Sequence, residues 1–170
     1  EIFSYDIAAD TVSPLTSMPS SADDFGDPII NSAGNVGYRA GSAAGDQYVV
    51  FDGTNATVYA SDADVESASP FSFLFSPGFA DGDMIAGKVR VGDAGDFGDD
   101  QPDEVRVFTG PGASEAVAED MDSNSGSPYA AFDNSVAVNG AGQVAFIAEL
   151  ASGNRAVIRT DGDTTTTIAE

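Results

Sequence analysis

Residues 29–40 read Ile-Ile-Asn-Ser-Ala-Gly-Asn-Val-Gly-Tyr-Arg-Ala, and a similar stretch, Val-Ala-Val-Asn-Gly-Ala-Gly-Gln-Val-Ala-Phe-Ile-Ala, returns at residues 136–148. Each copy is followed by a loop and a second similar stretch. Residues 47–60 read Gln-Tyr-Val-Val-Phe-Asp-Gly-Thr-Asn-Ala-Thr-Val-Tyr-Ala, and residues 156–169 read Ala-Val-Ile-Arg-Thr-Asp-Gly-Asp-Thr-Thr-Thr-Thr-Ile-Ala. This internal repeat determines how the rest of the chain is interpreted.

Each copy of the repeat predicts four short strands. Runs rich in Val, Ile, Tyr, Phe and Thr alternate with turns built from Asn, Asp and Gly, which is typical of antiparallel strands joined by hairpins. No long window places apolar residues at helical spacing. The sequence therefore predicts an all-β protein.

The repeat divides the chain into four parts. Residues 1–27 form a half-repeat and a polar link, and three full repeats follow at 28–70, 71–128 and 129–170. The middle repeat is degraded: residues 82–87 match 34–39, residues 105–110 match 48–53, and an acidic insertion separates them. We predict a single domain of tandem four-stranded antiparallel repeats, propeller-like, with three full repeats and an N-terminal half-repeat.

This repeat resembles the blade repeats of secreted, surface-anchored bacterial proteins, which are read as β-propeller-like. The resemblance rests on an apolar lead-in, Asn, Gly, Val, an aromatic residue and Ala, followed by a hairpin with Asp-Gly at its turn. It implies an extracellular or cell-surface protein, and it brings no catalytic residues with it. The chain starts at Glu1, and we expect it to be a mature product whose targeting segment has been removed.

Composition excludes several classes of function. The chain has 170 residues, six basic residues and a net charge of −22, so it lacks the clustered cations that nucleic acids require. It contains no Cys and no His, which removes the usual nucleophile and base of covalent catalysis. No run of apolar residues is long enough to span a membrane. We predict a protein that is not an enzyme.

The acidic insertion is the sharpest local feature. It runs from Gly92 to Glu104, and its carboxylates are those of Asp93, Asp96, Asp99, Asp100, Asp103 and Glu104. Calcium binds six to eight hard oxygen ligands, and glycines allow a loop to wrap around an ion. Two interpretations stay open, a Ca²⁺ site and a solvated acidic loop.

The half-repeat at the N-terminus has no second half in the chain. Its apolar residues are Ile2, Phe3, Tyr5, Ile7, Val12 and Leu15. They predict a hairpin that pairs either within its own chain or with a neighbouring molecule by strand addition. The second choice predicts a homo-oligomer or a filament. A monomeric module that binds a glycan or a cell-surface protein is the alternative.

The most apolar stretch is residues 71–75, Phe-Ser-Phe-Leu-Phe. Strand alternation predicts that Phe71, Phe73 and Phe75 share one face. This segment is expected to be a core strand, or a self-association strand if it is exposed.

Overall fold

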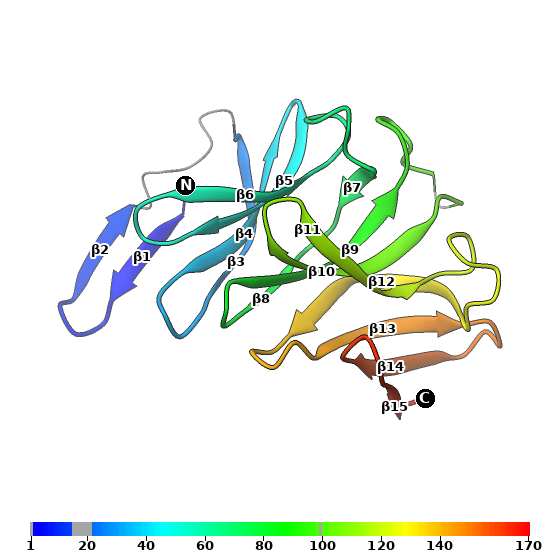
Figure 1. Cartoon of the computed structure of the whole chain (residues 1–170). Helices are drawn as coiled ribbons and strands as arrows, with labels where there is room; N and C mark the ends of the chain where they lie inside the picture. The colour runs from blue at the N-terminus through cyan, green and yellow to red at the C-terminus, as the bar shows by residue number, and fades with distance from the viewer. Residues whose placement is uncertain (1, 15–21, 99) are drawn as a thin grey trace.

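The computed structural model describes residues 2–14, 22–98 and 100–170, and these form fifteen strands in four antiparallel sheets (Figure 1). The described residues contain no helix, which confirms the all-β prediction. In that part of the chain, therefore, no helix has the length and apolar character needed to cross a bilayer.

Each sheet is built from strands that are neighbours in the sequence. The N-terminal hairpin pairs β1 (Phe3–Asp6) with β2 (Thr11–Pro14). The first sheet has the order β3 (Asp24–Ile30), β4 (Val36–Ser42), β5 (Gly45–Phe51) and β6 (Ala56–Ser61). The third sheet has the order β12 (Tyr129–Val138), β13 (Val144–Leu150), β14 (Arg155–Thr160) and β15 (Thr165–Ala169). β3 begins inside the segment that the sequence predicted to be a polar link.

The second sheet departs from this order at one edge. It comprises β7 (Phe71–Leu74), β8 (Gly78–Ala80), β9 (Met84–Val91), β10 (Asp103–Gly110) and β11 (Ala113–Glu119). Both β7 and β8 pair with β9, β7 near its C-terminal end and β8 near its N-terminal end. They thus form one edge in two pieces, interrupted at Pro77, since proline has no N–H to donate to a ladder.

The first and third sheets share a turn between their first two strands. The Asn31 Oδ1 atom accepts hydrogen bonds from the backbone N–H groups of Ala33 and Asn35, both at 3.0 Å. Asn139 makes the same two bonds in the third sheet, at 3.0 and 3.1 Å. Both turns place a glycine at positive φ, 86° at Gly34 and 78° at Gly142, a conformation that other residues rarely adopt.

The corresponding turn in the second sheet is shorter, and it makes one sequence prediction wrong. Ala80 pairs with Met84 across three residues, whereas Ile30 pairs with Val36 across five. Counted from the pairing with the following strand, Lys88, opposite Val105, occupies the position that Arg39 holds opposite Tyr48. The match of residues 82–87 to 34–39 is therefore out of register by one residue.

The predicted alternation in residues 71–75 is also wrong. A register shift lies between Phe71 and Phe73 in the pairing of β7 with β9, and such an irregularity changes which side chains share a face. Phe71 and Leu74 are buried in the core cluster between the first and second sheets. Phe73 instead packs against Phe75, with 4.8 Å between ring centroids.

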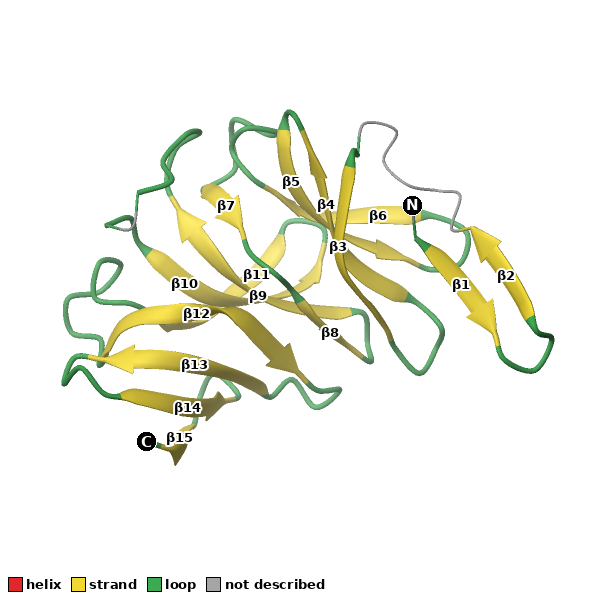
Figure 2. Ribbon diagram, turned by 180° about the vertical axis from the view of Figure 1, so that it is seen from behind, coloured by secondary structure: helices red, strands yellow, loops and turns green. Residues whose placement is uncertain are grey.

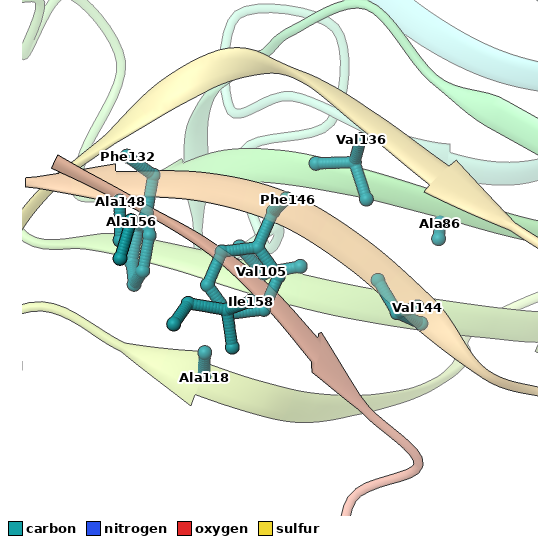
Figure 3. Close-up of a cluster of buried hydrophobic side chains, with 10 residues drawn as sticks. All are labelled: Ala86, Val105, Ala118, Phe132, Val136, Val144, Phe146, Ala148, Ala156 and Ile158. Atoms are coloured by element: carbon teal, nitrogen blue, oxygen red, sulfur yellow. The ribbon is translucent and has the colours of Figure 1, made fainter. Parts of the chain in front are cut away.

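The core lies between consecutive sheets. The cluster between the second and third sheets includes Ala86 and Val105 on one side and Phe132, Phe146 and Ile158 on the other (Figure 3). A second cluster joins Tyr48 and Val50 of the first sheet to Phe71, Ile85 and Phe108 of the second. The three sheets thus follow one another in chain order, each packed against the next.

Close backbone approach fixes two of these contacts. A Cβ atom at Gly87 would lie 2.3 Å from the hydroxyl of Tyr48, which donates a 2.8 Å hydrogen bond to the Phe75 carbonyl. At Gly78 it would lie 2.5 Å from the Val136 carbonyl oxygen. Larger residues at these positions would force the sheets apart.

Candidate functional site

The N-terminal hairpin projects from one end of the row of sheets, and β15 lies at the other end (Figures 1 and 2). The turn of the hairpin is stabilised by Asp6, whose Oδ1 atom accepts hydrogen bonds from the N–H groups of Ala8 (2.8 Å) and Ala9 (3.0 Å). This side chain–backbone bonding stabilises a short turn without glycine. Asp52 makes the same kind of turn in the first sheet, with Thr54 and Asn55 as donors.

One face of the hairpin is apolar and exposed. Phe3 lies opposite Pro14 and Tyr5 opposite Val12, and cross-strand partners share a face. Phe3 is 54% exposed, Tyr5 57% and Val12 63%. We call Phe3, Tyr5, Val12 and Pro14 the hairpin face. Small or polar residues, Ser4 opposite Ser13 and Asp6 opposite Thr11, occupy the other side.

The hairpin is anchored through Ile2, which is 8% exposed. Ile2 belongs to a buried cluster on the first sheet with Val36, Tyr38, Val49 and Phe51. Burial in this cluster raises the pKa of Tyr38 to about 12. Of the predicted assembly residues, Ile2 is therefore buried, Phe3, Tyr5 and Val12 share one exposed face, Ile7 lies exposed at the turn, and Leu15 falls outside the described residues.

The acidic insertion is divided by the structure. Asp93, Asp96 and Asp100 lie in the loop between β9 and β10, and Asp96 Oδ2 accepts a hydrogen bond from the Asp93 N–H at 3.2 Å. Asp103 and Glu104 lie in β10 itself, and Asp99 falls outside the described residues. Among the residues that the structure describes, no three acidic side chains are grouped closely enough to hold a metal ion. Calcium binding stays a prediction.

Asp103 forms a buried ion cluster with Lys88 and Arg90. Lys88 Nζ lies 2.8 Å from Asp103 Oδ2, and Arg90 Nε lies 2.9 Å from Oδ1. The ring of Phe75 covers both cations, with Lys88 Nζ 4.2 Å from its centroid. Charges this deep are tolerated because each is paired and hydrogen-bonded.

The same cluster links neighbouring segments. Lys88 donates a 3.1 Å hydrogen bond to the Phe132 carbonyl of the third sheet. Arg90 donates a 2.7 Å bond to the Phe97 carbonyl in the acidic loop. The sequence showed two cations two residues apart in a strand, but their partners come from a different strand and a different sheet. The cluster therefore positions the acidic loop and the third sheet, and Asp103 is paired with both cations.

Two linkers between sheets share a pattern that our sequence analysis missed. Residues 62–71 and 120–129 both read Asp-x-Asp, then Ser-Pro and an aromatic residue. Asp62 Oδ2 accepts a 2.6 Å bond from the Asp46 N–H, and Asp120 Oδ2 accepts a 3.0 Å bond from the Asp103 N–H. Burial raises the pKa of both carboxyl groups. The repeated Ser-Pro-aromatic triplet was the signal in the sequence.

A cavity of about 570 Å³ opens between β6 of the first sheet and β10 and β11 of the second. Tyr59, Phe71 and Phe108 contribute aromatic surface to its lining. Its charged groups are Glu66 and the ion pair of Glu104 with Arg106. Its size and mixed lining fit a small polar ligand.

Comparison with protein families, with curated proteins and with solved structures finds no match for this chain. Function is therefore argued from the residues and surfaces described above.

Proposed function

We propose that this chain is a non-enzymatic, extracellular structural protein that assembles with copies of itself through its N-terminal hairpin. The observation that supports this most directly is the hairpin face, which exposes Phe3, Tyr5 and Val12 while Ile2 anchors the hairpin to the first sheet. Two isolated strands are marginally stable in water, and an exposed apolar strand pair is a common site of association. A polymer of such units would be a homo-oligomer or a filament.

We further propose that the three sheets are tandem units of one propeller-like repeat and that the hairpin is half of such a unit. The matching turns at Asn31 and Asn139 support this, as do the matching turns at Asp6 and Asp52. The resemblance to repeats of secreted bacterial proteins favours the extracellular location. The lack of His and Cys favours a role without catalysis.

Size-exclusion chromatography with light scattering tests the assembly. The wild type is expected to form concentration-dependent oligomers, which negative staining should show as rings or filaments. Replacing Phe3 and Tyr5 together by Ser should leave a folded monomer, because the hairpin face contributes apolar contact area rather than core. Met121→Ser, an apolar-to-Ser change at another exposed position, in a linker, is the control. A wild type that stays monomeric at high concentration would contradict the proposal.

Calcium is proposed as a stabilising ion of the acidic loop. Calorimetric titration of the wild type should then give a binding isotherm that the combined Asp93→Asn, Asp96→Asn and Asp100→Asn variant loses. If both proteins give the same isotherm, this loop holds no calcium.

The cavity between the first two sheets favours a second candidate function, a monomeric binding module for a glycan or a protein segment. Aromatic side chains beside a charged pair are suited to stacking and hydrogen-bonding a sugar. Titration with a panel of oligosaccharides, comparing the wild type with Arg106→Gln, would test it. Binding by a monomeric wild type that Arg106→Gln abolishes would favour the module over the structural protein.

A further inference from the structure

The sheets of this chain stack in one direction. Each has a forward face, which contacts the sheet that follows in the chain, and a backward face, which contacts the sheet before it. Tyr48 and Val50 are on the forward face of the first sheet and pack against Phe71, Ile85 and Phe108. Val105 is on the forward face of the second sheet and packs against Phe146 and Ile158 of the third.

In the described residues, no sheet packs against the forward face of the third sheet, and its side chains Ile147 and Val157 are exposed. This face consists of three cross-strand pairs, Ala145 with Arg159, Ile147 with Val157, and Glu149 with Arg155. Val157 takes the position of Tyr48 and Val105, each of which is 0% exposed, yet Val157 is 37% exposed. Ile147, opposite it, is also 37% exposed. This position is thus buried in the first and second sheets and partly exposed in the third.

The hairpin has an exposed face of the opposite kind. Phe3 and Tyr5 precede the turn residue Asp6 by the same spacings at which Val49 and Phe51 precede Asp52. Ile2 correspondingly takes the place of Tyr48, and it packs on the first sheet as Tyr48 packs on the second. The hairpin face therefore corresponds to a backward face. No sheet of the described residues packs against it, and Phe3, Tyr5 and Val12 are exposed.

Charge also matches between the two open faces. Four of the six basic residues, Arg39, Lys88, Arg90 and Arg106, are at most 22% exposed in their side chains and form ion pairs within the first and second sheets. The remaining two, Arg155 and Arg159, lie exposed on the forward face of the third sheet, where Arg155 pairs with Asp133 of β12. The hairpin ends in the exposed carboxylates of Asp6 and Asp10. Arg155 is balanced by Asp133 and lies opposite Glu149, so Arg159 supplies the positive charge of this face that is suited to an acidic partner.

We infer that the forward face of the third sheet binds the hairpin face of a second copy of this chain. The inference rests on the proposed self-assembly and names the acceptor surface for it. Ile147 and Val157 of one molecule contact Phe3, Tyr5 and Val12 of the next, and Arg159 faces the acidic turn of the hairpin. Because the two faces are different surfaces at opposite ends of the molecule (Figure 1), the contact is head-to-tail and repeats from copy to copy.

Disulfide trapping can test this contact without removing any native thiol, since the chain contains no Cys. Tyr5→Cys protein is mixed with Val157→Cys protein under mild oxidation, and disulfide-linked dimers are identified by non-reducing electrophoresis and mass spectrometry. We expect roughly ten times more mixed dimer than with Ser67→Cys, an exposed linker position, as the partner. In the Val157→Cys background, Arg159→Glu should lower the yield about tenfold, whereas Arg159→Lys should retain it.

Each other outcome overturns the inference in a distinguishable way. Wild-type oligomers without a mixed dimer above the Ser67→Cys level would place the acceptor elsewhere and leave the proposed self-assembly intact. Predominant pairing of Tyr5→Cys with itself would indicate a symmetric hairpin dimer. An internal disulfide in dilute Tyr5→Cys/Val157→Cys double variant would indicate closure within one chain. A monomeric wild type would overturn both this contact and the proposed function.

Discussion

The second and third sheets place different residues on their forward faces. In the second sheet Lys88 lies opposite Val105, and both side chains are buried, with Asp103 neutralising the cation and the third sheet covering the surface. In the third sheet Ile147 lies opposite Val157, and both are partly exposed, with two arginines at the margin. A covered face can hold a charge in its interior only with a partner, whereas an open face keeps its charges at the rim. The difference distinguishes a face that another sheet covers from a face that is exposed.

The largest expected effect comes from the ion pairs of the two sheets. Asp103→Asn leaves Lys88 and Arg90 buried without their carboxylate, and we expect a loss of about 3–5 kcal/mol in the free energy of unfolding. Asp133→Asn, which removes the exposed partner of Arg155, should cost less than about 1 kcal/mol. Urea denaturation of both variants measures the difference, and equal losses would contradict the contrast between covered and open faces.

A smaller effect is expected at two corresponding valines, Val105 of the second sheet and Val157 of the third. Val105→Ala removes two buried methyl groups from the cluster between the second and third sheets and should cost about 2 kcal/mol. Val157→Ala should cost the monomer about 0.5 kcal/mol, because that side chain already contacts solvent. Thermal unfolding at low and high protein concentration would sharpen the comparison. Val157→Ala should lower the thermal stability more at high than at low protein concentration if another copy then covers its face.

The smallest effect concerns pH. Burial raises the pKa of Asp62 and Asp120, which close the ends of the first and second sheets. The folded state then binds protons more readily than the unfolded state, so the contribution of these two groups to stability should be fully present below the ordinary pKa of aspartate and should be lost as pH rises through the folded-state pKa. Asp52 and Asp81 have lowered pKa values, and their contribution is lost only below the ordinary pKa of aspartate.

The control for this pH dependence is the Asp62→Asn/Asp120→Asn double variant. It should be less stable overall, since each amide has lost one acceptor oxygen. Its unfolding midpoint should also change less than that of the wild type between neutral pH and a pH near the ordinary pKa of aspartate. If the unfolding midpoint of the double variant depends on pH as strongly as that of the wild type, other groups cause the pH dependence.

Local signals made the strands and turns predictable. Asn31 with Gly34 and Asn139 with Gly142 mark turns that depend only on nearby backbone groups, so they are readable from the sequence. The same reasoning misplaced the register of β9, because a turn two residues shorter leaves no clear trace in composition. It also misassigned Phe73, whose direction depends on an irregularity in the pairing with β9.

The ion cluster was beyond such reasoning for a different reason. Asp103 belongs to an acidic run in the sequence, and only the antiparallel pairing of β9 with β10 brings it against Lys88 and Arg90. The open forward face of the third sheet was equally unreadable. Ile147 and Val157 look like ordinary core residues in the sequence, and only the structure shows that both are partly exposed. The hairpin, in contrast, was predictable as a pair of strands from its local sequence.

The contiguity of each sheet in the sequence has a consequence for how the protein folds. The first sheet is complete once residue 61 has been made, the second once residue 119 has, and no strand waits for a partner from a distant part of the chain. Pairings between sequence neighbours have low loop-closure entropy and form quickly. The chain can therefore fold in order from its N-terminus during synthesis, each new sheet covering the forward face of the one before it.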